Sequence, residues 1–298
     1  MAIPEAQLKT WASQGATDTS ASTYQTIKLA LESADATYAN KGPKIFLQGS
    51  YRNDTNIWKE SDVDVVLMTN SMFSYDTSGL PRPQQAAFSA AHSDTTYSYA
   101  EFKAAVLLTL RARFGTAVVP GTKAFTINAL HNRRKSDVLV AINHKKFSRF
   151  TALHNEEAVE GIAFYKSDGT KVVNYPKLHR SNLAARNQLT NGWLKHIVRI
   201  FKNARERMIT NELIDEGIAP SYFIEGLLFN APVDRFGDTY DDSMVKCINW
   251  LHAADKTTFV CPNRQYKLLD CGDDISWTSA NCETFLDALA EFWTHFDD

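Results

Sequence analysis

The chain of 298 residues has few cysteines, and their spacing does not match a common zinc site. None of them forms a Cys-x-x-Cys pair, and no His-x-x-x-His sequence lies near them. The four cysteines of the chain are therefore expected to be reduced, mostly buried thiols. They are Cys247, Cys261, Cys271 and Cys282.

Long hydrophobic runs and an excess of charge are also missing. Without a stretch of about 18 apolar residues, the sequence predicts no membrane span, and residues 1–10 lack the layout of a secretory signal. The formal net charge is −2. Proteins that bind long nucleic acid usually carry a basic excess, because neutralised phosphates supply most of the affinity. These absences favour a cytoplasmic protein with a small polyanionic ligand over a membrane protein or a binder of long nucleic acid.

What is present predicts two lobes, a mixed α/β lobe over residues 1–175 and a mainly helical lobe over 176–298. The 44% of hydrophobic residues suffices for a sizeable core. In the first lobe, hydrophobic periodicity predicts a long helix over 18–40 and a second helix over 99–114. Strands are expected at 45–47, 62–68, 122–128 and 135–142, an exposed excursion at 71–98, and a polar crossing at 165–180. In the second lobe, helices are expected at 189–208, 221–229, 243–253 and 282–296.

The clearest chemical motif is a pair of aspartates at the start of a predicted strand. Because successive side chains of a strand face opposite ways, Asp62 and Asp64 share one face while Val63 and Val65 enter the core. Two carboxylates on one face repel each other unless a cation lies between them. Hard divalent cations such as Mg²⁺ prefer oxygen ligands of this kind. The alternative is a surface strand with two solvated aspartates.

A glycine-serine turn precedes this strand. Gly49 allows the backbone to approach a ligand closely, Ser50 adds a hydroxyl, and successive amides of such a turn can receive phosphate oxygens. Phosphoryl transfer of the polymerase type uses two metal ions, and a third carboxylate on a neighbouring strand completes such a site. Asp137, at the start of an apolar strand, is the candidate. A cap or turn role for Asp137 remains open, and Asp94 is a weaker candidate.

Seven short segments carry a family resemblance, among them Gln48-Gly49-Ser50-Tyr51 and Glu60-Ser61-Asp62-Val63-Asp64-Val65-Val66. Together they resemble the bacterial cGAS/DncV-like nucleotidyltransferases of the polymerase-beta-like superfamily. The resemblance implies an α+β protein with a polymerase-beta-like catalytic lobe, which has a mixed sheet and a long N-terminal helix. A mainly helical lobe follows, and the active site lies in the cleft between the two. The matching clade contains members that use pyrimidine nucleotides. The matching segments are 48–51, 53–56, 60–66, 175–182, 186–190, 198–202 and 220–225.

Two cations of the second lobe match the family's triphosphate-binding positions. Arg199 and Lys202 are three residues apart, so they lie side by side on a helix. The resemblance implies that both contact the triphosphate of the nucleotide. The alternative is a solvated basic helix face that also includes Lys195 and Arg205.

Three further positions match residues that contact the nucleotide in the family. The resemblance implies that Ser221 contacts phosphate, that Tyr222 stacks on the donor base, and that Asn182 reads uracil. The alternatives are a capping serine and a core tyrosine. For the asparagine, a helix cap remains open, and Asn187 lies nearby.

The resemblance implies a bacterial anti-phage enzyme of the CBASS type, acting as a cytoplasmic monomer. It would make a cyclic di- or trinucleotide from ribonucleoside triphosphates, ATP among them, and release pyrophosphate. Asp62 and Asp64 would bind two Mg²⁺ or Mn²⁺ ions, and Asp137 would position the acceptor hydroxyl. The product, a diffusible second messenger, would activate a separate effector.

Two other functions remain open. One is a nucleotidyltransferase that modifies a small molecule or a tRNA end, which the segments 175–182 and 198–202 argue against. The other is a non-catalytic nucleotide-binding module. Such a module gains nothing from the repulsion among three carboxylates.

Overall fold

A computed structural model of the chain describes residues 3–15, 17–59, 62–93, 95–131, 133–272 and 275–296. The chain divides into two compact units. The helical unit comprises Met1–Thr17, Gly49–Ser61 and Lys177–Asp298, and the sheet unit comprises Asp18–Gln48 and Asp62–Pro176. The last boundary between the units lies at 176/177. Two segments before it, however, belong to the helical unit.

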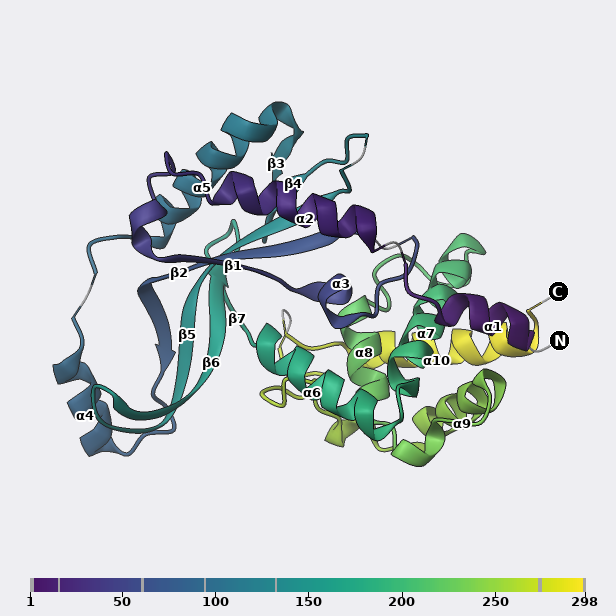
Figure 1. The fold of residues 1–298 in the computed structure, drawn as a ribbon. Helices are drawn as coiled ribbons and strands as arrows, with labels where there is room; N and C mark the ends of the chain where they lie inside the picture. Colours follow the sequence, from purple (N-terminus) through teal and green to yellow (C-terminus); the bar gives the residue numbers. More distant parts are fainter. Residues whose placement is uncertain are drawn as a thin grey trace. The chain divides into compact units, whose positions relative to one another are not determined.

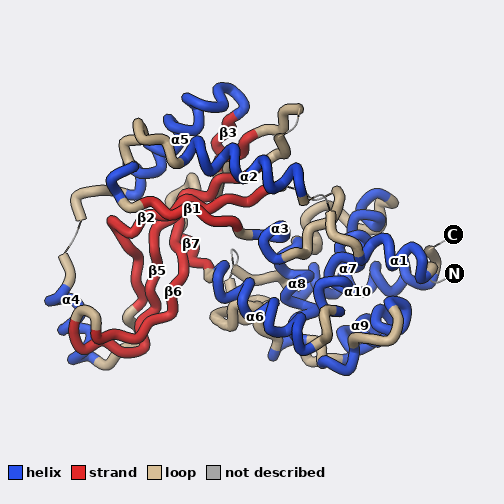
Figure 2. Tube along the Cα trace, in the orientation of Figure 1, coloured by secondary structure: helices blue, strands red, loops and turns tan. Residues whose placement is uncertain are grey.

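The described strands of the sheet unit form one mixed sheet (Figures 1 and 2). Its path is β1-β2-β5-β4-β3, with β6 on the later part of β5 and β7 on β6. β2 and β5 pair in parallel, and the other pairs are antiparallel. The predicted mixed sheet is therefore confirmed. The strands are β1 (Pro43–Leu47), β2 (Val63–Asp76), β3 (Val118–Pro120), β4 (Phe125–Ile127), β5 (Ser136–Ala152), β6 (Asn155–Tyr165) and β7 (Lys171–Asn174).

Two helices, α2 (Asp18–Leu31) and α5 (Tyr99–Phe114), cover one face of this sheet (Figure 1). Their apolar side chains form a core with alternate residues of β2 and β5. The observed bounds of α5 are those predicted. Ser98 and Glu101 form a capping box there, which satisfies the first free amides of the helix. This unit also contains short 3-10 turns at Ala39–Lys41 and Gly115–Ala117.

The predicted helix over 18–40 is too long, because α2 ends at Leu31. Tyr38 explains the difference. Its ring packs edge-on against Phe102 with 5.6 Å between ring centroids, and its hydroxyl donates to the Leu31 carbonyl at 2.9 Å. That bond satisfies one of the carbonyls that a helix end leaves free. The chain therefore turns back after Leu31, and Tyr38 is buried in the core.

The excursion predicted over 71–98 is only partly irregular. β2 continues to Asp76, and α4 (Arg82–Ala91) follows. Leu80 and Phe88 pack there with Phe147 and Phe150 of β5, forming a small second core. This core accounts for the extension of β5 beyond the predicted end at 142 into a hairpin with β6. The polar crossing predicted over 165–180 contains β7 and the first turns of the next helix.

The helical unit is built around α7 (Trp193–Thr210; Figure 1). Its apolar residues Leu194, Ile197, Phe201 and Ala204 are buried in the core of the unit. Leu8 and Trp11 of α1 join the same core, which explains why the N-terminal segment belongs to this unit. Within the described residues, no helix is both long and apolar enough to cross a membrane. The helices are α1 (Glu5–Ala12), α3 (Gly49–Asn53), α6 (Pro176–Leu189), α7 (Trp193–Thr210), α8 (Ser221–Asn230), α9 (Tyr240–Ala253) and α10 (Ser279–Thr294), with 3-10 turns at Val233–Arg235 and Lys256–Thr258.

The four thiols are all free, and three of them are buried, as predicted. Cys271 is the exposed one. Burial raises the pKa of Cys247 and Cys282 to about 12, so both stay protonated at neutral pH.

We expect Gly161→Ala to destabilise the sheet unit. A Cβ at Gly161 would lie 2.7 Å from the Asn174 carbonyl oxygen and 2.8 Å from the Tyr175 ring. Relief of this overlap must shift the backbone of β7, which costs about 1–3 kcal/mol. The free energy of unfolding, measured by urea denaturation, tests this. Gly79→Ala is the control, because its Cβ meets only the Phe147 carbonyl oxygen at 3.4 Å. Equal stability of the two variants would contradict the argument.

Candidate active site

The parallel register of β2 and β5 places Asp64 directly opposite Asp137. Both aspartates are half-buried, whereas Val63, Val65 and Val138 beside them are fully buried. Asp62 precedes β2 by one residue, and the alternation of strand side chains gives it the same face as Asp64. The expectation that Asp137 lies on the strand next to the motif is thus confirmed. Its competitor Asp94 lies outside the described residues.

The carboxylates of this edge already have partners. Lys135 donates from Nζ to Oδ2 of Asp62 at 2.8 Å, and Thr126 donates from Oγ1 to Oδ1 of Asp137 at 2.6 Å. The hydrogen bond and the charge of Asp62 raise the pKa of Lys135, with smaller contributions from Asp137 and Asp64. A lysine ammonium therefore supplies part of the positive charge that three neighbouring carboxylates require.

The donor set fits a hard divalent cation, since all three candidate side chains offer carboxylate oxygens on one face of the sheet. In the described residues, however, no three His, Cys, Asp or Glu side chains are gathered closely enough to hold a metal ion. In this structure Lys135 and Thr126 occupy one oxygen each of Asp62 and Asp137. For the carboxylates to bind a cation together, Asp62 must give up its ion pair with Lys135. The metal-binding roles of Asp62, Asp64 and Asp137 stay predictions.

The glycine-serine turn is the start of a short helix. Gly49 begins α3 with a φ of +69°, a left-handed conformation that glycine adopts without strain. The turn is closed by the Thr55 amide, which donates to the Ser50 carbonyl at 3.0 Å. Gly49 and Ser50 belong to the helical unit. Their contact with phosphate stays a prediction.

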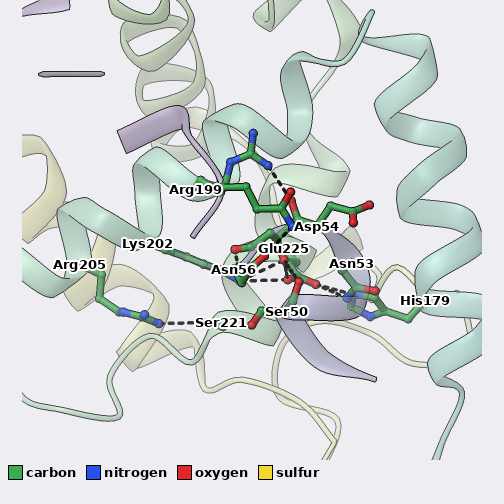
Figure 3. A network of polar contacts seen from close by, with 12 residues as sticks. Ser50, Asn53, Asp54, Asn56, His179, Arg199, Lys202, Arg205, Ser221 and Glu225 are labelled. Atoms are coloured by element: carbon green, nitrogen blue, oxygen red, sulfur yellow. Dashed lines mark hydrogen bonds and ion pairs between the residues drawn. The ribbon is translucent and has the colours of Figure 1, made fainter. Parts of the chain in front are cut away.

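The basic face of α7 is directed at the segment that follows this turn (Figure 3). Lys195 donates from Nζ to Oδ2 of Asp54 at 2.7 Å, and Arg199 donates from Nη1 to the Asp54 carbonyl at 2.6 Å. Lys202 donates from Nζ to the Thr55 carbonyl at 3.2 Å. Spacings of four and three residues put all three cations on one side of the helix.

A solvated basic face is therefore excluded for this helix. Arg199 is 6% exposed, Lys202 is 0% exposed and Arg205 is 4% exposed. Arg199 also donates from Nε to the Ala12 carbonyl, which ties the N-terminal segment to α7. Contacts of Arg199 and Lys202 with a triphosphate stay predictions. The hydrogen bonds of both side chains given above are to other residues of the same chain.

Glu225 of α8 was not among the predicted site residues, yet it lies at the centre of the polar network in Figure 3. It is 2% exposed. Burial alone raises the pKa of Glu225, but the Lys202 ammonium and the hydrogen bonds from His179 and Thr55 outweigh it and hold the pKa well below its usual range. The sequence feature that could have identified Glu225 is a single acidic residue inside an otherwise mostly apolar helix, Ser-Tyr-Phe-Ile-Glu-Gly-Leu-Leu-Phe.

Ser221 and Tyr222 open α8 as predicted, although Ser221 does not cap it. Pro220 occupies the N-cap position, and Ser221 instead accepts a hydrogen bond from Nη1 of Arg205 at 3.3 Å. The Tyr222 ring lies 4.7 Å from the His179 ring, between centroids, and its hydroxyl accepts from Nδ2 of Asn263 at 3.0 Å. Burial raises the pKa of Tyr222 far above its usual value.

Asn182 lies in the middle of α6 and donates from Nδ2 to the Pro262 carbonyl at 2.7 Å. It therefore does not cap a helix. Asn187 does have a structural role, because its Oδ1 accepts from the Lys195 amide at 3.0 Å, in the first turn of α7. Residues 262 and 263 thus hold both Asn182 and Tyr222, the two side chains predicted to contact a base.

Comparisons with known proteins agree with this arrangement. Residues 181–294 match the C-terminal helical domain of cGAS/DncV-like nucleotidyltransferases. The chain is 38% identical to a cyclic UMP-AMP synthase of Rhodothermus marinus, with 99% of each chain covered. It is 31% identical to the cyclic nucleotide synthase CdnE01 of Staphylococcus haemolyticus, over 99% of this chain and 100% of that protein. A solved structure of the Rhodothermus marinus synthase with Apcpp and Upnpp superimposes with a TM-score of 0.88 at 37% identity, covering 99% of this chain and 98% of that one.

The mixed sheet, its aspartate-bearing parallel strands and the helical unit define a nucleotidyltransferase with a polymerase-beta-like fold. The chain belongs to the cGAS/DncV-like nucleotidyltransferase family. Its matched relatives include one named for a uracil-containing product.

We expect Lys135→Gln to tighten the binding of Mn²⁺ by up to about fivefold, in line with the small free energy of an exposed ion pair. The substitution removes an ammonium that competes with the cation for Asp62. Calorimetric titration with Mn²⁺ and no nucleotide measures the effect independently of catalysis. Lys44→Gln is the matched control, since it removes one positive charge from β1 at the end remote from the aspartates. Unchanged or weaker affinity in Lys135→Gln would show that no such competition exists.

Proposed function

We propose that the protein is a metal-dependent synthase that makes a cyclic di- or trinucleotide second messenger from ribonucleoside triphosphates. The observation that carries the proposal is the register that sets Asp64 opposite Asp137, with Asp62 next to them. Similarity over the full length to a cyclic UMP-AMP synthase supports the same activity. That relative also supports a product that contains a pyrimidine.

In this proposal, Asp62 and Asp64 supply carboxylate oxygens to two Mg²⁺ or Mn²⁺ ions, and Asp137 helps to orient the acceptor hydroxyl. When bound, the ions would activate the attacking hydroxyl and neutralise the leaving pyrophosphate. Thr126 fixes one oxygen of Asp137 by a hydrogen bond, which limits the rotation of that carboxylate. Val63 and Val65, which flank Asp64 and are fully buried, keep β2 in register, so the spacing of the carboxylates is set by the sheet.

The helical unit supplies the nucleotide-binding residues. Gly49 and Ser50 offer backbone amides and a hydroxyl to the phosphates, and Ser221 offers a second hydroxyl. Of the two cations that the resemblance assigns to the triphosphate, Arg199 contributes positive charge there, whereas Lys202 is paired with Glu225. The planar, permanently charged guanidinium is the better match for phosphate oxygens.

Tyr222 and Asn182 are proposed to contact the base. An aromatic ring stacks on any base, so Tyr222 contributes affinity without selecting one. An amide presents both a donor and an acceptor to a base edge. The Pro262 carbonyl takes one Nδ2 proton of Asn182, which leaves its Oδ1 and the second proton for the base. Selection of uracil therefore falls to Asn182.

The family relationship also supports a biological role. The product would act as a second messenger in anti-phage defence of the CBASS type and reach a separate effector by diffusion. The substrates are cytoplasmic ribonucleotides, so the enzyme is proposed to work there, as a monomer. Neither long nucleic acid nor a membrane is required for this activity.

One incubation separates this function from its rivals. The protein is mixed with all four labelled ribonucleoside triphosphates and Mg²⁺ or Mn²⁺, and products are resolved after phosphatase treatment. A phosphatase-resistant cyclic product supports the proposal. Labelled tRNA or a labelled small acceptor in parallel reactions would indicate the other transferase activity, and no turnover at all would indicate a binding module.

We predict that Asp62→Asn combined with Asp64→Asn abolishes product formation and leaves the fold intact. Amides bind divalent cations far more weakly than carboxylates do, so no catalytic metal is held. Removal of like charges should leave the thermal midpoint equal or higher, because the ion pair with Lys135 is half exposed and contributes little. Product analysis and a thermal melt are run on the same preparation. Full activity in the double variant would refute the proposed metal site.

We predict that Asn182→Ser changes base preference more than total turnover. Loss of one hydrogen bond to a base edge corresponds to about a tenfold change in the ratio of pyrimidine to purine use. Turnover of each single triphosphate measures that ratio. Asn187→Ser is the matched control, since its side chain accepts from the Lys195 amide and is not proposed to meet a base. An unchanged ratio in Asn182→Ser would exclude the reading role while leaving the metal site intact.

A further inference from the structure

A buried carboxylate with every acceptor position occupied lies in the helical unit (Figure 3). Glu225 accepts four hydrogen bonds, two at each oxygen. Oε2 accepts from Nδ2 of Asn53 at 2.9 Å and from Nε2 of His179 at 2.7 Å. Oε1 accepts from the Thr55 hydroxyl and from Nζ of Lys202 at 3.0 Å. An ionised carboxylate has about four acceptor positions, so this one is saturated.

The Lys202 ammonium is saturated in the same way. Its Nζ lies 3.0 Å from Oε1 of Glu225, 3.2 Å from the Thr55 carbonyl and 3.3 Å from the Thr55 hydroxyl. An ammonium has three protons, and these three acceptors use all of them. The side chain is 0% exposed. In this arrangement Lys202 has no proton left to donate to a triphosphate.

We propose that these five residues position the Gly49–Ser50 turn, and that Lys202 is the internal counter-ion of Glu225. We call them the Glu225 cluster, namely Asn53, Thr55, His179, Lys202 and Glu225. Each is a positioning residue that acts through the turn. The inference rests on the proposed function, because it concerns how the phosphate-binding turn is held.

The connection from the cluster to the turn is short. Asn53 is the last residue of α3, the five-residue helix that begins at Gly49. The Thr55 amide donates to the Ser50 carbonyl at 3.0 Å. Arg199 holds the Asp54 carbonyl between the two cluster residues. Three consecutive residues after the turn are thus tied to α7 and α8, and the turn has little freedom to move independently.

The sign of the charge makes the proposal testable. Glu225 carries a negative charge, so a purely electrostatic effect of Glu225→Gln would be tighter binding of a triphosphate. The positioning role predicts the opposite result. A glutamine keeps one acceptor oxygen and presents two protons in place of the other. Depending on which oxygen is replaced, either Asn53 and His179 or Thr55 and Lys202 lose their acceptor, and the turn is released.

The experiment uses the full-length protein and two measurements. Hydrogen exchange, followed by mass spectrometry, reports the protection of amides 49–56. Equilibrium titration with a non-hydrolysable triphosphate analogue and Mg²⁺, well below each thermal midpoint, reports affinity. For Glu225→Gln we expect exchange at 49–56 to accelerate about tenfold and the affinity to weaken about tenfold.

Ser243→Ala controls for a general loss of stability. Ser243 is 0% exposed in α9, and its hydroxyl donates to the Gly237 carbonyl at 2.8 Å. Its loss should lower the thermal midpoint and leave both exchange at 49–56 and triphosphate affinity within about twofold of the parent, since distant sites act independently. A purely structural role of Glu225 predicts the same behaviour for Glu225→Gln.

A milder pair of variants keeps the test decisive if Glu225→Gln does not fold. Thr55→Val removes the hydroxyl that bridges Glu225 and Lys202, and Thr55→Ser retains it. We expect Thr55→Val to reproduce the faster exchange and weaker binding, and Thr55→Ser to restore both. Unchanged exchange in Glu225→Gln or Thr55→Val, or tighter binding, overturns the inference. If the unmodified protein binds no triphosphate, the proposed function fails, whereas exchange still decides whether the cluster holds the turn.

Discussion

The candidate catalytic edge depends on the parallel pairing of β2 and β5. This pairing sets Asp64 opposite Asp137 while burying Val65 and Val138 beside them. A slip of one residue would turn the aspartates into the core and the valines outward, so the hydrophobic pattern fixes the spacing of the carboxylates. Like charges on adjacent strands oppose the pairing, and Lys135 offsets part of that repulsion. The sheet therefore holds a charge arrangement that favours a cation.

The helical unit contains a buried carboxylate, Glu225, whose charge must be compensated. An unpaired buried carboxylate would be strongly destabilising, and removal of one partner from a buried ion pair costs about 3–5 kcal/mol. Glu225 and Lys202 remain buried because each finds its full set of hydrogen-bond partners. The segment that carries Asn53 and Thr55 supplies several of these partners. The short helix α3 and the loop after it thereby acquire a fixed position, which a binding site built on such a segment requires.

Local sequence signals predicted those parts of the fold that depend on neighbouring residues. The helix over 99–114 and the strand alternation around Asp64 depend on residues a few positions apart, and both predictions were confirmed. The end of α2 and the length of β5 were missed, because each depends on contacts between distant segments. Tyr38 packs on Phe102, and Phe147 packs under α4. Glu225 was missed for the same reason, since its partner Asn53 lies 172 residues away.

The two basic residues of α7 illustrate why a motif alone does not assign a contact. Resemblance gives Arg199 and Lys202 the same role, but their surroundings differ. The charge of Lys202 is cancelled by Glu225 at 3.0 Å, so the pair contributes little net potential at a distance. Arg199 donates to the neutral carbonyls of Ala12 and Asp54, and the Asp54 carboxylate that also attracts it is paired with Lys195. Its charge is screened only weakly where it is buried, and a guanidinium does not lose its proton. We therefore infer that Arg199 supplies the positive potential that α7 would offer to a triphosphate, whereas the proposed role of Lys202 is to hold the Gly49–Ser50 turn.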